Sequence, residues 1–116
     1  MEQFKSAYRE ELMAEYKNIL QFWMDKTIDK DYGGFLGEVD NYGNPVAGAD
    51  KGIVLNARIL WTFASAYNFL GNSAYLEIAH RAYRYITAYF WDKEYKGLFW
   101  SVTHQGEMLD GRKQIY

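Results

Sequence analysis

The stretch DKGIVLNARILWTFASAYNFL, residues 50–70, predicts the centre of a helical fold. It has the length of a helix, and apolar residues fall on nearly every side of the helix that it would form. A single arginine, Arg58, lies in its middle. Because an arginine keeps its charge in any protein environment, we expect Arg58 to have either a carboxylate partner or a polar cavity beside it.

Two amphipathic helices are predicted on either side of this segment. Residues 2–26 repeat apolar residues at spacings of three or four, with charged residues between them: Phe4, Tyr8, Leu12, Tyr16, Ile19 and Trp23. A second such helix is predicted from about Ser73 to Phe90, after a stop at Gly71 and a cap at Asn72. Its expected buried side consists of Leu76, Ala79, Tyr83, Ile86 and Phe90. We expect the helix between these two to be almost entirely buried.

A segment rich in Gly and Asp follows each amphipathic helix, at residues 29–46 and 92–109. Six pairs of residues match between them at an offset of 63: Asp29 and Asp92, Lys30 and Lys93, Tyr32 and Tyr95, Gly34 and Gly97, Val39 and Val102, Gly43 and Gly106. Each segment has two short strand-like runs around a turn with glycine, which predicts a β-hairpin. The chain is therefore a repeat, with units at about 1–63 and 64–116.

Repeats of this kind bury their apolar faces against neighbouring units. The second unit reaches RKQIY, residues 112–116, where its own inner helix would begin. We therefore expect residues 1–116 to be the truncated N-terminal part of a single all-α domain, a ring of helical hairpins with inner helices along its axis. Arg58, Thr62 and Ser65 lie at i, i+4 and i+7, so they form a polar stripe that indicates a cavity beside the inner helix.

Composition argues against several classes of protein. The 116 residues include 13 basic and 15 acidic ones, and no basic stripe follows from their order, which argues against nucleic acid as a partner. No apolar run approaches the ~20 residues of a membrane span, and no signal peptide or cysteine is present. We expect a soluble, cytoplasmic protein without a membrane partner, and the oligomeric state stays open.

Five stretches carry a resemblance to a known family: YGGFLGEVDNYGN, ADKGIVLNARILWTFASAYNFLG, YLEIAHRAYRYI, FWDKEYKGLFWSV and RKQIY. Together they resemble the N-terminal third of the cellobiose 2-epimerases, within the N-acylglucosamine 2-epimerase superfamily. LNARILWTF and RKQIY are the specific parts, and the resemblance covers essentially the whole chain. It implies an (α/α)6 barrel of about 400 residues, in agreement with six units of about 63 residues.

The resemblance also implies a reaction without metal or redox cofactor. The reducing-end glucose of a β-1,4-linked disaccharide such as cellobiose opens, one histidine removes the C2 proton, and a second returns a proton to the opposite face of a cis-enediol. Arg58 matches the family's essential arginine, so we expect it to bind substrate and to stabilise the enediolate. Tyr116 matches a tyrosine that lines the pocket, so we expect it to hydrogen-bond the sugar.

The family's catalytic histidines lie downstream of these residues. His80 and His104 match no family motif, and we expect both to be surface histidines. The chain alone is therefore expected not to epimerise. Several alternatives stay open: an N-acylglucosamine 2-epimerase or an aldose–ketose isomerase on the same barrel, or a non-catalytic helical-repeat module that binds carbohydrate or protein. In the last case Arg58 would pair with a carboxylate and serve packing.

Two further patterns are weaker. Asp29, Asp31 and Gly34 occupy the first, third and sixth positions of a calcium-binding loop, but the fifth and last positions do not fit. The tryptophans could stack on sugar faces, although Trp23 and Trp91, at the ends of outer helices, are expected in the core. Trp61 and Trp100 are not assigned.

Overall fold

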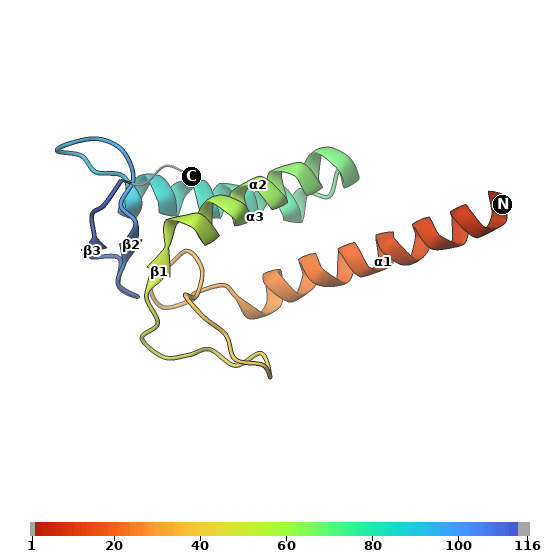
Figure 1. The fold of residues 1–116 in the computed structure, drawn as a ribbon, viewed down its shortest axis with the longest axis horizontal. Coiled ribbons are helices and arrows are strands. Elements are labelled where there is room, and N and C mark those ends of the chain that lie inside the picture. The colour runs from red at the N-terminus through yellow and green to blue at the C-terminus, as the bar shows by residue number, and fades with distance from the viewer. Residues whose placement is uncertain (1, 114–116) are drawn as a thin grey trace.

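The computed structural model describes residues 2–113 and shows three long helices with a small sheet at one end (Figure 1). The elements are α1 (Glu2–Lys26), β1 (Lys51–Gly52), α2 (Ile53–Leu70), α3 (Ser73–Tyr85), the π-helical turn η1 (Ile86–Phe90), β2 (Ser101–Val102) and β3 (Met108–Asp110). α2 and α3 pack side by side as a helical hairpin, whereas α1 lies apart from them and its N-terminal part extends beyond the end of this hairpin (Figure 1). The three helices predicted from the sequence are confirmed.

The connection between α2 and α3 is made by the two residues predicted to stop and cap a helix. Gly71 ends α2 with φ 74°, in the left-handed region that glycine adopts without strain, and its N–H donates to the carbonyl of Tyr67 at 2.8 Å. The Asn72 side chain accepts a hydrogen bond from the N–H of Ala74 at 2.9 Å. The turn between α2 and α3 is therefore determined by hydrogen bonds within a few residues of it.

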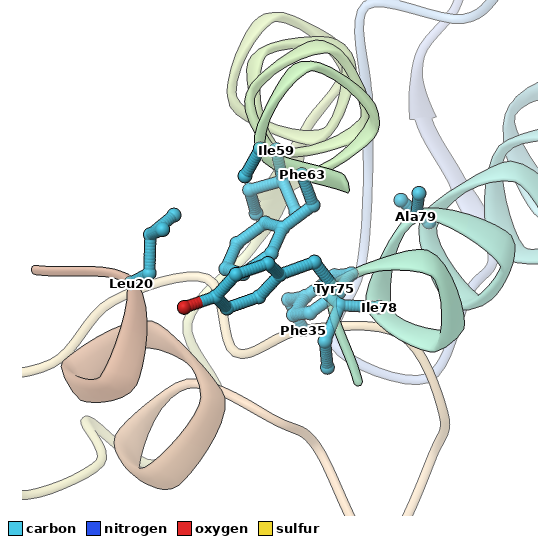
Figure 2. Close-up of a cluster of buried hydrophobic side chains, with 9 residues drawn as sticks. Leu20, Phe35, Ile59, Phe63, Tyr75, Ile78 and Ala79 are labelled. Atoms are coloured by element: carbon cyan, nitrogen blue, oxygen red, sulfur yellow. The ribbon is translucent and has the colours of Figure 1, made fainter. Parts of the chain in front are cut away.

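The main apolar core lies where α2, α3 and the last turns of α1 meet. Figure 2 shows Phe63 and Ile59 on α2 directed toward Tyr75 on α3, with Leu20 of α1 on the opposite side. The ring centroids of Phe63 and Tyr75 are 6.1 Å apart. Phe4, by contrast, is exposed, and the apolar face of the N-terminal half of α1 packs against no other element among the described residues. The core therefore holds the hairpin and anchors α1 at its C-terminal end.

Two predictions about helix faces are wrong. Tyr83, expected on the buried side of α3, is 58% exposed, because the buried side runs through Tyr75, Ile78, Ala82 and Tyr85 instead. α2 is not almost entirely buried either. Only the face with Asn56, Ile59, Phe63 and Ala66 is buried, since within residues 2–113 the helix packs against neighbours on one side. Apolar composition alone does not say which neighbours a helix has.

The two predicted hairpins form to different extents. In the second segment, β2 pairs with β3 in an antiparallel hairpin. In the first, the chain makes isolated bridges, such as that between Ile28 and Phe35, and no regular strand pair. Instead β1 pairs antiparallel with β2, which gives a three-stranded sheet in the order β1-β2-β3. The sheet thus links the two segments, a pairing that no local pattern predicts.

The turn after each outer helix has the same structure in both segments. Asp29 and Asp92 each accept, through Oδ1, the backbone N–H groups of the residues two and three positions further on, all at 3.0 Å. The N–H of Asp29 donates to the carbonyl of Gly34 at 3.1 Å, and that of Asp92 to Gly97 at 2.9 Å. These shared bonds explain why Asp29 matches Asp92 and Gly34 matches Gly97 at the offset of 63. Among residues 2–113, no helix has the length and apolarity needed to cross a membrane.

Tyr85 makes the stability of the fold depend on pH in the alkaline range. The residue is 3% exposed, and its hydroxyl makes no hydrogen bond with the described residues. Burial, followed by the negative charges of the Tyr89 phenolate and of Asp29, raises the pKa of Tyr85 to about 12. The unfolded value is about 10. The neutral phenol therefore stabilises the fold fully below pH 10, and this contribution is lost as the pH rises from 10 to 12.

In the parent protein, ionisation of Tyr85 should lower the unfolding free energy by about 1 kcal/mol between pH 9 and 11. We expect this part of the decline to be absent in Tyr85→Phe. At pH 7 the variant should be as stable as the parent protein, because the lost hydroxyl has no described partner. Urea unfolding at pH 7, 9 and 11 measures both effects. Equal declines in the two proteins between pH 9 and 11 would contradict the assignment.

Candidate functional site

A groove of about 940 Å³ runs along the N-terminal half of α2. Arg58 and Thr62 line it from α2, and Trp91, Trp100 and Lys113 line it from the segment that follows α3. The groove therefore lies between the inner helix and the loops at the end of the hairpin where the sheet forms. This position agrees with the cavity that the polar stripe predicts, although Ser65, the third residue of the stripe, is half-buried elsewhere on the helix.

Arg58 is exposed on the unpacked face of α2. It forms no ion pair or hydrogen bond with any residue between 2 and 113, so a purely structural carboxylate partner is not found in the described part of the chain. The groove's other two described cations are paired: Arg112 with Asp110 at 2.6 Å, and Lys113 with Asp92 at 2.8 Å. None of the five N–H donors of Arg58 is shared with a residue between 2 and 113, so within this part of the chain all five can bind a ligand in the groove.

The paired cations lower the pKa values of the carboxylates beside them. The hydrogen bond from Lys113 holds the pKa of Asp92 below its ordinary value, and that from Arg112 does the same for the pKa of Asp110. Both carboxylates therefore stay ionised and compensate their cations at neutral pH. The positive charge left over in the described part of the groove is that of Arg58, which suits a ligand that develops negative charge.

Three tryptophans line the groove, and sequence reasoning anticipated this poorly. Trp61 is 73% exposed on α2, and Trp100 lies beside β2. Trp91, expected in the core, lines the groove as well, whereas Trp23 packs against the main core as predicted. The π-helical turn η1 ends at Phe90, and its wider turn rotates the next residue away from the α-helical spacing. Aromatic faces beside polar donors are typical of sugar sites.

The remaining candidates from the sequence lie elsewhere. His80 is exposed on α3, and His104 packs edge-on against Tyr32 with ring centroids 5.3 Å apart. Neither histidine lines the groove. Tyr116 lies outside the described residues, so its contact with the sugar stays a prediction.

A buried ion pair outside the groove was missed by sequence reasoning. Lys51 is 1% exposed, and its Nζ donates to Asp29 Oδ2 at 2.7 Å and to the carbonyl of Gly33 at 3.0 Å. Oδ1 of Asp29 accepts two backbone N–H groups and Oδ2 accepts a lysine, so both carboxylate oxygens already have partners, in line with the weak match of this turn to a calcium-binding loop. The sequence does contain a sign of this pair. At an offset of 62 rather than 63, Lys51 aligns with Lys113, which pairs with Asp92.

The carboxylate of Asp29 is held in its charged form. Burial by itself would raise its pKa, but the hydrogen bond from Lys51 and the backbone N–H groups of Tyr32 and Asp31 outweigh burial, so the pKa lies below its ordinary value. The pair stabilises the fold above the unfolded pKa of about 3.9, and this contribution is lost as the pH falls through the lower folded value. At neutral pH the ion pair is therefore fully formed.

The helical hairpin, the repeated turn and the sheet at one end define part of an (α/α)6 barrel, which confirms the all-α fold expected from the sequence. Residues 9–116 match the family model of N-acylglucosamine 2-epimerase (GlcNAc 2-epimerase), and the chain belongs to this family. It is 47% identical over 98 residues to the cellobiose 2-epimerase of Bacteroides fragilis, covering 84% of this chain and 25% of that protein. The family resemblance is thereby confirmed.

Two further matches lead to the same family. The cellobiose 2-epimerase of Dictyoglomus turgidum is 38% identical over 98 residues, which cover 84% of this chain and 25% of that protein. The solved structure of cellobiose 2-epimerase from Spirochaeta thermophila matches with a TM-score of 0.84 at 40% identity, over 90% of this chain and 26% of that chain. The chain thus spans about a quarter of the length of the curated relatives that it matches.

Proposed function

We propose that the protein to which this chain belongs is a sugar 2-epimerase that interconverts reducing-end glucose and mannose in β-1,4-linked disaccharides, converting cellobiose to glucosyl-mannose. The proposal is supported by membership of the N-acylglucosamine 2-epimerase family and by the cellobiose 2-epimerases among its relatives. The observation that carries it is the guanidinium of Arg58, in the specific motif LNARILWTF. It has no ion-pair or hydrogen-bond partner among residues 2–113 and lies at the wall of a tryptophan-lined groove.

The chemistry explains why such a group belongs at this site. A proton leaves C2 of the open-chain sugar only if the negative charge that develops on O1 and O2 is stabilised. A guanidinium is permanently charged and presents a planar fork of donors, so it can bind both oxygens of a cis-enediolate. Since the sugar gains and loses one proton at the same carbon, the reaction as written has no net oxidation.

The proton acceptor and donor come from elsewhere in the whole protein. General-base catalysis at neutral pH needs a group that titrates near 7 within hydrogen-bond reach of C2, and histidine is the usual choice. No histidine among residues 2–113 lines the groove. We therefore assign the acid and base to histidines beyond Tyr116, with Tyr116 donating a hydrogen bond to the sugar.

The experiment is incubation of the full-length protein with cellobiose in D2O, followed by NMR of C2 and chromatography of the products. Epimerisation gives glucosyl-mannose with deuterium at C2. A ketose product would identify an aldose–ketose isomerase, and exchange with N-acetylglucosamine but not cellobiose would identify the other epimerase activity. Sugar binding without C2 exchange would support a binding module and overturn the proposal.

A further inference from the structure

Lys51 occupies a position that lysine rarely takes. Lysine is almost never fully buried unless its charge is paired. Here Nζ is enclosed by Asp29 Oδ2 at 2.7 Å, by the carbonyl of Gly33 at 3.0 Å, and by the ring of Tyr85, whose centroid is 4.7 Å away. A carboxylate, a carbonyl and an aromatic face together replace the water that the ammonium loses on burial.

The partners of Lys51 are themselves fixed by α3. Arg81 donates from Nε to the carbonyl of Gly34 at 2.9 Å and from Nη2 to the carbonyl of Asp29 at 2.7 Å. Tyr85, one turn further along α3, packs against the same turn, since a Cβ on Gly34 would lie 2.5 Å from its ring. The turn at residues 29–34 is therefore clamped by α3, and Lys51 is tied to this turn rather than to a mobile loop.

This anchor lies directly before the inner helix that carries Arg58. Lys51 is in β1, and α2 begins at Ile53, two residues later. Arg58 lies five residues into α2, or roughly 8 Å along the helix axis at about 1.5 Å per residue. Because Lys51 lies only two residues before the first turn of α2, we expect a shift at Lys51 to move the start of the helix and Arg58 with it. Small displacements of a group that stabilises a transition state are costly.

We propose that Asp29 and Lys51 are positioning residues, whose ion pair fixes the start of α2 and so places the Arg58 guanidinium in the groove. The inference rests on the proposed function, because it assigns to the pair a role in the rate of epimerisation. It goes beyond stability: neither residue lies in the groove with Arg58, and both act through the helix.

A second copy of the pair supports a role tied to the site. Lys113 Nζ bonds Asp92 Oδ2 at 2.8 Å and lies 5.5 Å from the ring centroid of Phe99. In the sequence, Lys113 precedes Tyr116 by three residues. Each pair thus comes shortly before a residue that the family resemblance assigns to the sugar. The side chains of the first pair are 1% and 6% exposed, against 38% and 9% in the second, so the first should have the larger effect.

The test uses the full-length protein and measures kcat and KM for cellobiose in Lys51→Met, Asp29→Asn and the control Lys30→Met. Lys30 is exposed on the same turn. We expect kcat to fall about 10- to 100-fold in Lys51→Met and Asp29→Asn, expressed per folded molecule, with Lys30→Met unchanged. Asp29→Asn keeps an acceptor for the N–H groups of the turn, so it provides a folded variant if Lys51→Met is unstable.

The decisive measurement combines each variant with Arg58→Ala. If the pair acts through Arg58, Lys51→Met lowers kcat by less than about 3-fold once Arg58 is gone, because the group that it positions is absent. The same 10- to 100-fold fall in both backgrounds, or a folded Asp29→Asn protein with parental kcat, would overturn the inference. A parent protein without epimerase activity would instead overturn the proposed function.

Discussion

Replacing Arg58 with alanine in the full-length protein is expected to lower kcat/KM for cellobiose by roughly 100- to 1,000-fold, the usual cost of losing a preorganised charge-stabilising donor. Arg58 is exposed and has no hydrogen-bond or ion-pair partner among residues 2–113, so its loss leaves no buried group unpaired there. The unfolding free energy should therefore change by no more than about 0.5 kcal/mol. Rates from the C2 exchange assay and a thermal melt measure the two quantities.

Two further variants sharpen this result. Arg58→Lys keeps the charge but not the planar fork, so we expect it to recover only a small part of the lost rate. Arg84→Ala removes an exposed arginine from α3, away from the groove, and should leave kcat/KM unchanged. If Arg58→Ala kept activity within about threefold of the parent, or if it lost stability and activity together, the role in enediolate stabilisation would be untenable.

Replacing Phe63 with alanine is expected to cost about 3–5 kcal/mol of unfolding free energy. Phe63 is 1% exposed and lies where α2, α3 and α1 meet, with Tyr75 and Leu20 around it (Figure 2). Truncation removes the transfer free energy of the ring and leaves a cavity between helices whose ends are fixed by Gly71 and Asn72. Urea unfolding of the full-length protein, with the midpoint and slope fitted separately, measures the loss.

A graded series separates core packing from other effects. Phe63→Leu keeps most of the volume and should cost less than about 1.5 kcal/mol. Tyr42→Ala removes a ring that is 88% exposed in the loop before β1, and should cost less than about 0.5 kcal/mol. Similar losses for Phe63→Ala and Tyr42→Ala would mean that the core around Phe63 does not hold the helical hairpin.

Much of the fold followed from short-range patterns. The spacing of apolar residues predicted α1 at residues 2–26 and the third helix at 73–90, and Gly71 and Asn72 predicted the turn before it. These features depend on interactions within about four residues, such as i, i+4 contacts and caps, which the sequence contains directly. The match between Asp29 and Asp92 also reflects local bonds, because each carboxylate accepts N–H groups two and three residues ahead.

The groove could be predicted only in outline. The stripe of Arg58, Thr62 and Ser65 indicated a cavity, and the first two of these residues line one. Trp91 was expected in the core from its place at the end of an outer helix, but the π-helical turn before it departs from the α-helical period, and Trp91 lines the groove instead. The exposed face of α2 was missed because an apolar helix gives no sign of which side its neighbours occupy.

The sequence by itself therefore determined the helices, their ends, the repeated turn and the family to which the chain belongs. Only the tertiary structure decided which face of α2 opens on the groove, that β1 pairs with β2, and that Lys51 is buried against Asp29. The physical reason is how far apart in the sequence the interacting residues lie. A helix period or a cap is complete within one or two turns, whereas an ion pair between residues 22 positions apart exists only once α3 has packed against the turn that holds it.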